Sequence, residues 1–247
     1  MAREKKWWET FFEDFRPAFR REPPGETLKQ ARAIFRKLEM KKGMRFLDCP
    51  CGFGRIGLPL ARMGLKVTGV DLTRSYLDEF AASARRSGVR VELVHEDMRR
   101  ITFDAQFHAA ANLYTSFGYF PSDSQNVLVL RRIFRALRPG GRFLMSIINR
   151  DWILVNFTPS DWSEVGGVRI LQTRRFDYAR SVMHDTWHFL KDGTEKVHRT
   201  TLRLYSFHEL RALFERVGFI DIEGCGSLDG RPTGRTNRDI FVLARKP

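Results

Sequence analysis

Cysteine is scarce in this 247-residue sequence, with three residues in all, and two of them, Cys49 and Cys51, are separated by a single residue. Three cysteines are too few for the disulfide framework of a small secreted domain. The pair also lacks the further ligands of a zinc site, so no metal site is predicted. No apolar run approaches the roughly 20 residues of a membrane span. The first residues, MAREKKWWETFFEDF, lack the apolar block of a secretory signal. These absences favour a cytoplasmic protein with no membrane partner.

Acidic residues are in the minority, with 29 Asp and Glu against 43 Lys and Arg, which gives a net charge of +14. Such a balance suits a nucleic-acid partner or an acidic substrate. However, the chain contains no run of five or more Lys and Arg, and its basic residues are spread over the whole length. General surface charge is therefore favoured, and a nucleic-acid partner remains possible but not favoured.

The most informative stretch is FLDCPCGFGRIGLPLARMGLKVTGVDLT, residues 46–73, which predicts strand, glycine turn, helix and second strand in that order. Gly52 and Gly54 lie in the turn, where a Cβ would obstruct the approach of a ligand to the backbone. The helix that follows offers free N–H groups at its start. Asp71 ends the second strand, where a carboxylate can accept hydrogen bonds from both hydroxyls of a ribose. The stretch therefore predicts a site for a nucleoside-bearing cofactor.

Two cofactors compete for this site. Gly52, Gly54 and Gly57 match the G-x-G-x-x-G pattern of dinucleotide-binding proteins, which is weak evidence alone. Against it, Asp48 precedes the glycines, where a carboxylate would attract the ammonium of a methionine group and repel a pyrophosphate. VELVHEDM (91–98) predicts a third strand followed by Asp97, which is placed to receive an adenine amino group. S-adenosylmethionine (SAM) is therefore favoured over NAD.

The chain resembles the class I SAM-dependent methyltransferases along most of its length from about residue 41. The resemblance rests on LDCPCGFG, GVDLT, EDM, NLYTSFGYF, LRPGG and LRALFERVGF in this order and spacing. It implies SAM as cofactor and S-adenosylhomocysteine as product. The cofactor-binding residues it implies are Asp48, Cys49, Pro50, Cys51, Gly52, Gly54, Asp71, Leu72, Asp97, Met98 and Asn112.

Pro50 departs from the family pattern, which usually has a glycine at this position of the turn. Proline fixes φ and removes a backbone donor, so the turn must differ locally. A tolerated variant is the favoured interpretation. The alternative is an altered methionine pocket, which leaves open a protein that binds SAM without catalysis.

The periodicity predicts an α/β, Rossmann-like, doubly wound sheet of seven strands with the last strand antiparallel. Strands are expected near 44–48, 65–70, 89–95, 107–112, 142–149, 219–224 and 239–245. We expect residues 1–40 to form an N-terminal helical lid, starting with an aromatic-rich helix over 4–20; packing of that helix on the core is an equally supported interpretation. The methyltransferase domain is expected at 41–151 and 206–247. An antiparallel β insertion, expected at 152–205 after strand five, has three recognisable strands and a KDGT turn, and would cover the substrate.

The acceptor site is less clearly marked. Tyr114 and His188 are weak catalytic candidates, because each could orient the acceptor or take its proton. Ordinary packing or a solvated histidine is the more common role for such residues. Arg231, Arg235 and Arg238 could bind a carboxylate or phosphate, or simply lie in a solvated loop. The predicted substrate-binding residues are Trp8, Phe12, Tyr114, Tyr119, His188 and Arg231.

The residues that follow the fourth predicted strand indicate the substrate class. Asn112 is not followed by the Pro-Pro-aromatic sequence of nucleic-acid amino methyltransferases, and no cysteine is placed there for cytosine C5 chemistry. The N-terminal cover and the insertion resemble those of small-molecule N- and O-methyltransferases. We therefore expect in-line methyl transfer to N or O of a small molecule. An RNA or protein methyltransferase is the alternative enzyme, and the sequence leaves the acceptor atom and the oligomeric state open.

Overall fold

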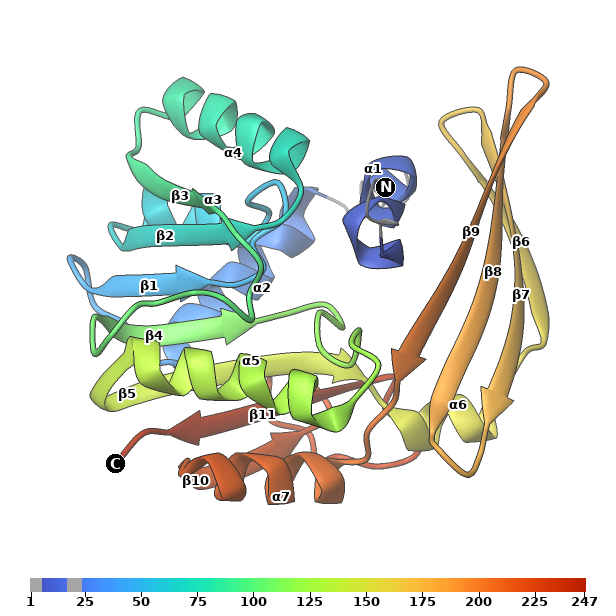
Figure 1. Cartoon of the computed structure of the whole chain (residues 1–247). Helices are drawn as coiled ribbons and strands as arrows, with labels where there is room; N and C mark the ends of the chain where they lie inside the picture. The colour runs from blue at the N-terminus through green and yellow to red at the C-terminus, as the bar shows by residue number, and fades with distance from the viewer. Residues whose placement is uncertain (1–5, 17–23) are drawn as a thin grey trace, which may run out of the picture.

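A seven-stranded mixed sheet forms the centre of the computed structural model, which describes residues 6–16 and 24–247 (Figure 1). Its order is β10-β11-β5-β4-β1-β2-β3. The strands are β1 (Arg45–Asp48), β2 (Lys66–Asp71), β3 (Val91–His95), β4 (Phe107–Asn112), β5 (Leu137–Ile148), β10 (Ile220–Cys225) and β11 (Asp239–Arg245). Strands β3, β2, β1, β4 and β5 pair in parallel, whereas β11 is antiparallel to both of its neighbours. The predicted doubly wound sheet with an antiparallel last strand is confirmed.

Helices cover both faces of this sheet, because each face carries apolar side chains that must be buried. One face packs against α2 (Pro24–Lys37), α3 (Gly57–Arg62) and α4 (Arg74–Arg86), with Leu60 and Phe80 fully buried. The other packs against α5 (Asp123–Ala136) and α7 (Phe207–Val217), with Leu130 and Phe214 fully buried. No helix in the described part of the chain is long and apolar enough to cross a membrane.

The insertion after β5 begins with α6 (Arg150–Val155) and forms a separate four-stranded antiparallel sheet, which projects away from the central sheet (Figure 1). Its strands are β6 (Ser160–Val165), β7 (Val168–Asp177), β8 (Val182–Lys191) and β9 (Thr194–Arg203). The predicted turn joins β8 to β9, with Asp192 and Gly193 both at positive φ. The prediction of an antiparallel insertion is confirmed, but its count of three strands is wrong, because the exposed edge strand β6 was not recognised.

The N-terminal segment is not the single helix predicted over 4–20. The structure places a short 3-10 helix, η1 (Trp7–Glu9), before a short α-helix, α1 (Phe11–Phe15), with the break at Thr10. Residues 4–5 and 17–20 of the predicted helix lie outside the described residues. The segment 7–15 lies between the central sheet and the insertion sheet (Figure 1). Trp8 packs into the core of the central sheet, and Phe11 packs against the insertion.

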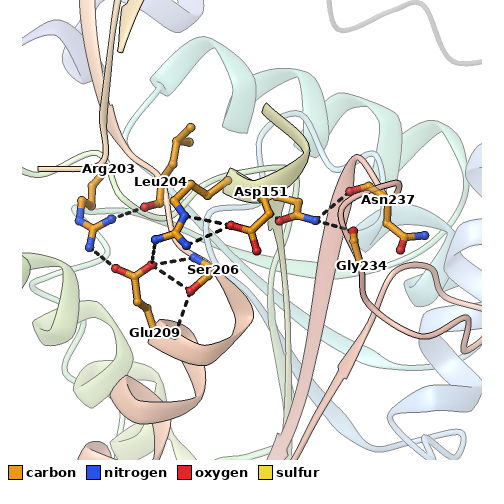
Figure 2. Close-up of polar contacts among 9 residues, drawn as sticks. Asp151, Arg203, Leu204, Ser206, Glu209, Gly234 and Asn237 are labelled. Carbon is orange, nitrogen blue, oxygen red and sulfur yellow. Dashed lines mark hydrogen bonds and ion pairs between the residues drawn. The ribbon is translucent and has the colours of Figure 1, made fainter. Parts of the chain in front are cut away.

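Polar side chains join the base of the insertion to the central domain (Figure 2). Glu209, in the first turn of α7, accepts hydrogen bonds from Arg203 at the end of β9 and from Arg150 at the start of α6, at 2.5 and 2.7 Å. It also accepts from the backbone N–H of Ser206, which caps α7. Ser206 and Glu209 form a capping box, and the same carboxylate fixes both ends of the insertion.

Candidate active site

A cavity of about 600 Å³ opens at the carboxyl ends of β1, β2 and β4, where open α/β sheets bind their ligands. The volume falls in the usual range for a small-molecule site, about 300–1,000 Å³. Twelve of the predicted site residues line it: Trp8, Phe12, Asp48, Pro50, Cys51, Gly52, Asp71, Leu72, Asp97, Met98, Tyr114 and Tyr119. The structure therefore brings together segments that lie far apart in the sequence.

The glycine turn after β1 is held by backbone hydrogen bonds to both neighbouring strands. Cys51 N–H donates to the carbonyl of Val70 at 2.8 Å, and Cys49 N–H donates to that of Ala111 at 3.0 Å. Gly52 has a φ of +53° and faces the cavity, and a Cβ there would meet nothing closer than 3.9 Å. Gly54 has a φ of +82°, and its Cβ would lie 2.2 Å from the Phe80 ring. The second glycine therefore serves the packing of α4 and does not line the cavity.

Asp71 is a buried carboxylate at the tip of β2. One oxygen accepts from the backbone N–H of Gly52 and the other from that of Thr73, each at 2.8 Å. Burial raises the pKa of Asp71, and the two N–H donors oppose that rise. The hydroxyl of Thr73 and the backbone N–H of Leu72 also oppose the rise.

Asp48 is 3% exposed and lies beside the turn. Burial, together with the charge of Asp71, raises the pKa of Asp48 to about 8, although the N–H of Gly57 and the Arg55 guanidinium oppose the rise. A positive group bound in the cavity would favour the charged form of Asp48. The site is therefore suited to a cation at this point.

Asp97 follows β3 and is paired with Arg99. The guanidinium contacts both carboxylate oxygens, with Nη2 to Oδ2 at 2.6 Å and Nε to Oδ1 at 3.1 Å. Burial would raise the pKa of Asp97, but Arg99 holds it below its ordinary value. Asp97 is therefore ionised at neutral pH and held in one orientation.

Five predicted site residues do not line the cavity: Cys49, Gly54, Asn112, His188 and Arg231. Asn112 lies below it, where the amide donates to the carbonyl of Cys49 at 3.0 Å and ties β4 to the glycine turn. Cys49 is fully buried in the apolar core. His188 is on β8, with Nδ1 2.6 Å from Glu195 Oε1 on β9. Arg231 is an exposed loop residue near Asp229.

The cavity also has walls that the sequence did not assign to the site. Gln30 of α2 accepts hydrogen bonds at Oε1 from Arg55 at 3.0 Å and from the Tyr114 hydroxyl at 2.9 Å. The Arg55 guanidinium lies 3.8 Å from the centre of the Tyr114 ring. Tyr114 and Thr115 both have positive φ, 58° and 61°, a strained conformation of the kind found at binding sites. Of Gln30 and Arg55, only Arg55 could have been assigned to the site from the sequence, because it follows the glycine turn.

Aromatic side chains close the cavity on the side of the N-terminal segment. The ring of Trp8 meets that of Phe120 edge-on, with centroids 5.2 Å apart, and Phe12 lies against Tyr119 at 5.7 Å. The hydroxyl of Tyr76 donates to the carbonyl of Phe12. Burial raises the pKa of Tyr119, whose hydroxyl is hydrogen-bonded to Ser116. This cover is largely apolar.

These residues fit a nucleoside that carries positive charge. Asp48, Asp71 and Asp97 surround one half of the cavity, and a pyrophosphate there would face the first two carboxylates. The arrangement therefore agrees with the amino-acid and ribose parts of SAM and disagrees with a dinucleotide.

Comparison with known proteins supports this conclusion. Residues 46–141 match the family model described as a methyltransferase domain. The Bacillus subtilis protein YqeM, named as a methyltransferase, is 29% identical over 211 residues, which cover 82% of this chain and 84% of YqeM. A SAM-dependent methyltransferase structure from Clostridium acetobutylicum has a TM-score of 0.79 at 14% identity, covering 98% and 99% of the two chains. SAM-bound CalS10 from Micromonospora echinaspora, an amino pentose methyltransferase, has a TM-score of 0.67 at 19% identity, covering 99% and 100%.

The fold, the acid-lined cavity and the matching family model define one class of protein. Residues 46–141 form a methyltransferase domain, and the whole chain has the fold of the SAM-dependent methyltransferases.

Proposed function

We propose that this enzyme transfers the methyl group of SAM to a nitrogen or oxygen atom of a small molecule by in-line displacement. The observation that carries the proposal is the form of the cavity. Acidic side chains line part of the cavity and Trp8, Phe12 and Phe15 cover it, so the acceptor must fit inside a confined space. A small molecule can enter such a space more readily than a folded macromolecule.

In this proposal the acid-lined half holds the cofactor. Asp71 accepts from the ribose hydroxyls, Asp97 accepts from the adenine amino group, and Leu72 and Met98 flank the adenine. Asp48 attracts the ammonium of the methionine group, next to Cys51 and Gly52. SAM, when bound, supplies a methyl group that is already activated by its sulfonium.

The other half positions the acceptor. Tyr114, Thr115 and Ser116 follow β4 and face the cavity beside Tyr119. Because its raised pKa keeps Tyr119 protonated, the hydroxyl orients the acceptor by hydrogen bonding and does not remove a proton. Tyr114 stays a candidate for the same role, whereas the position of His188 outside the cavity argues against it as a base. Positioning and exclusion of water can then supply most of the rate enhancement.

The name of CalS10 supports a small acceptor, since that protein is an amino pentose methyltransferase with the same fold. The high net charge of this chain is the only feature that favours RNA, and it does not bear on the cavity itself.

The proposal is tested with the full chain, isotopically labelled SAM and pooled cell metabolites, with RNase-treated and protease-treated pools in parallel. We expect label in low-molecular-weight compounds, unchanged by either nuclease or protease. The variant Asp71→Ala should lose this activity, and Asp78→Ala, which alters an exposed ion pair with Arg74, should keep it. Label found only in RNA or protein would establish the alternative substrate, and cofactor binding without turnover in any pool would favour a non-catalytic SAM-binding protein.

A further inference from the structure

Along the sheet edge that the cavity follows, Asp48 and Asp71 lie toward one end, and Arg238 and Asp239 lie toward the other. The strand order places the tips of β2, β1, β4, β5 and β11 in sequence along the sheet edge. The cavity residues along this edge are, in the same order, Asp71, Asp48, Tyr114, Ser146 and Arg238. Asp48 and Asp71 belong to the half assigned to the cofactor, and Arg238 stands at the far end of the other half, next to Asp239.

Arg55 is the other arginine among the described residues that line the cavity, and in the proposed function the cofactor accounts for its charge. The Arg55 side chain is fixed by Gln30 and by the Tyr114 ring, and its charge opposes the rise in the pKa of the nearby Asp48. A methionine group whose ammonium is attracted to Asp48 carries its carboxylate on the same carbon atom. Arg55 is placed to receive that carboxylate, which leaves Arg238 for another anion.

Arg238 is held in place through its backbone. The buried Asn149, at the end of β5, donates its N–H to the carbonyl of Arg238 at 2.8 Å. The Asn149 amide donates to the carbonyls of Gly234 and Asn237 at 2.9 and 3.0 Å, contacts drawn in Figure 2. Asp239 then pairs with Ile148 as β11 begins. The loop is thus fastened to the strand that lies next to it in the cavity wall.

Arg238 is an exposed residue that lines the cavity, and no hydrogen bond or ion pair from another described residue engages its side chain. Asp239 lines the cavity as well. A guanidinium in this setting has its planar fork of donors available for a carboxylate or phosphate.

We infer that the methyl acceptor carries an anionic group, a carboxylate or a phosphate, which Arg238 binds. The inference rests on the proposed function, because it assigns the second half of the cavity to the acceptor. Because β11 is two strand spacings from β4, the backbone at the start of β11 lies roughly 10 Å along the sheet edge from the tip of β4. The body of the acceptor then spans Tyr114, Ser146 and Phe241.

The first experiment measures anion binding without turnover. Acetate, inorganic phosphate and pyrophosphate are each titrated at constant ionic strength into the full chain saturated with S-adenosylhomocysteine, and the midpoint of thermal unfolding is recorded. We expect at least one anion to raise the midpoint saturably in the wild type and in Arg231→Gln, an exposed control from the same loop. Arg238→Gln should abolish the rise and Arg238→Lys should restore part of it. An equal rise in Arg238→Gln, or no rise with any anion, would overturn the inference.

The second experiment identifies the anion in the acceptor. Labelled products from the metabolite screen are separated by anion exchange, after phosphatase treatment or carboxyl esterification of the pool. Loss of labelling after phosphatase assigns a phosphate, and loss after esterification assigns a carboxylate. Arg238→Gln should raise the KM for the acceptor about ten- to hundredfold, the range for losing hydrogen bonds to a charged group, without changing S-adenosylhomocysteine affinity.

The proposed function and the role of Arg238 are overturned by different results. Labelling of neutral or cationic small molecules would overturn the role of Arg238 and leave the proposed function standing. Labelling of RNA or protein alone would overturn the proposed function, whereas the anion titration would still report on Arg238 directly.

Discussion

The buried carboxylates of Asp71 and Asp48 affect the stability of the free protein, and both line the cavity where a ligand would bind. Asp71 accepts two backbone N–H bonds, whereas Asp48 has its pKa raised to about 8 by burial and by the charge of Asp71. Substitutions at the two positions should therefore change stability in opposite directions.

Asp71→Ala should weaken S-adenosylhomocysteine binding by about 1.5–3 kcal/mol, the range for losing a hydrogen bond to a charged group. It should also lower the free energy of unfolding by about 1–3 kcal/mol, because the N–H groups of Gly52 and Thr73 lose their acceptor. Calorimetric titration and urea unfolding measure the two effects, and Asp71→Asn, which keeps one acceptor oxygen, should lie between. Unchanged affinity in Asp71→Ala would remove the residue from the site.

Asp48→Asn should be more stable than the wild type at high pH. The folded protein holds a proton on Asp48 up to about pH 8, whereas the unfolded chain releases it near pH 4. The folded state therefore binds more protons between these values, and the wild-type free energy of unfolding falls as pH rises across this window. Asparagine has no proton to lose, so its advantage should grow from pH 5 to pH 8. A stability difference between the two proteins that does not change with pH would contradict the raised pKa of Asp48. Asp48→Asn should also bind the cofactor more weakly.

The acids and glycines at the carboxyl edge of the sheet were predictable from sequence, because a strand tip followed by glycines and an acid has one local structure. The remaining walls of the cavity were less predictable, because they depend on which strands become neighbours. Of the three arginines named from one loop, Arg238 lines the cavity and Arg231 does not. Asn112 was expected to contact the cofactor, yet its side chain turns toward the backbone of Cys49.

At the scale of secondary structure, the N-terminal segment 7–15 connects two parts of the molecule. Asp14 of α1 accepts from Lys196 Nζ at 2.6 Å and from His198 Nε2 at 2.9 Å, both on β9. On the other side, Arg16 pairs with Glu79 of α4. We propose that this segment is a lid that orders over the bound cofactor and acceptor, as flexible lids do; permanent packing is the alternative.

Asp14→Ala should lower activity more than stability. The ion pairs it removes are partly exposed and contribute up to about 1 kcal/mol, so the melting temperature should fall by no more than about 4 °C. The acceptor KM should rise, because the segment loses its attachment to β9. Limited proteolysis supplies the decisive measurement, with Asp78→Ala as the control. Protection of the first twenty residues only in the presence of S-adenosylhomocysteine supports a lid, and equal protection with and without ligand would show permanent packing.

The elements themselves were largely predictable where their signals are local. Ser206 with Glu209 starts α7 and Gly218 ends it, as the sequence indicates, because capping depends on neighbouring residues. Strand β6 was missed because SDWSEV is an exposed edge with little apolar alternation. The break at Thr10 was missed because it arises from packing: Trp8 and Phe11 are buried against two different sheets.

At the scale of the whole molecule, the central sheet and the insertion sheet must keep their relative position for the cavity to stay covered. Both connections to the insertion converge on Glu209, which lies at the start of α7 and pairs with Arg150 and Arg203 (Figure 2). Burial would raise the pKa of Glu209, but the N–H of Ser206 and the guanidinium of Arg203 hold it below its ordinary value.

Glu209→Gln should therefore destabilise the protein and loosen the insertion together. The loss of two charge-assisted hydrogen bonds should lower the free energy of unfolding by about 1–3 kcal/mol. Because the folded pKa of Glu209 is depressed, its stabilising effect is full above the unfolded pKa, near 4.3, and disappears as pH falls through the folded value. The difference between wild type and Glu209→Gln in urea unfolding should thus be constant at pH 6–8 and shrink below pH 4.

Arg211→Ala provides the matched control, since it removes an exposed pair with Glu215 on the same helix and touches neither connection to the insertion. It should change stability by no more than about 0.5 kcal/mol. If Glu209 joins the two sheets, Glu209→Gln should also increase hydrogen exchange across β6–β9 while exchange in β1 and β4 stays slow. Exchange that rises equally in both sheets would show that Glu209 stabilises α7 alone, and the insertion would then owe its position to the apolar contacts of the N-terminal segment.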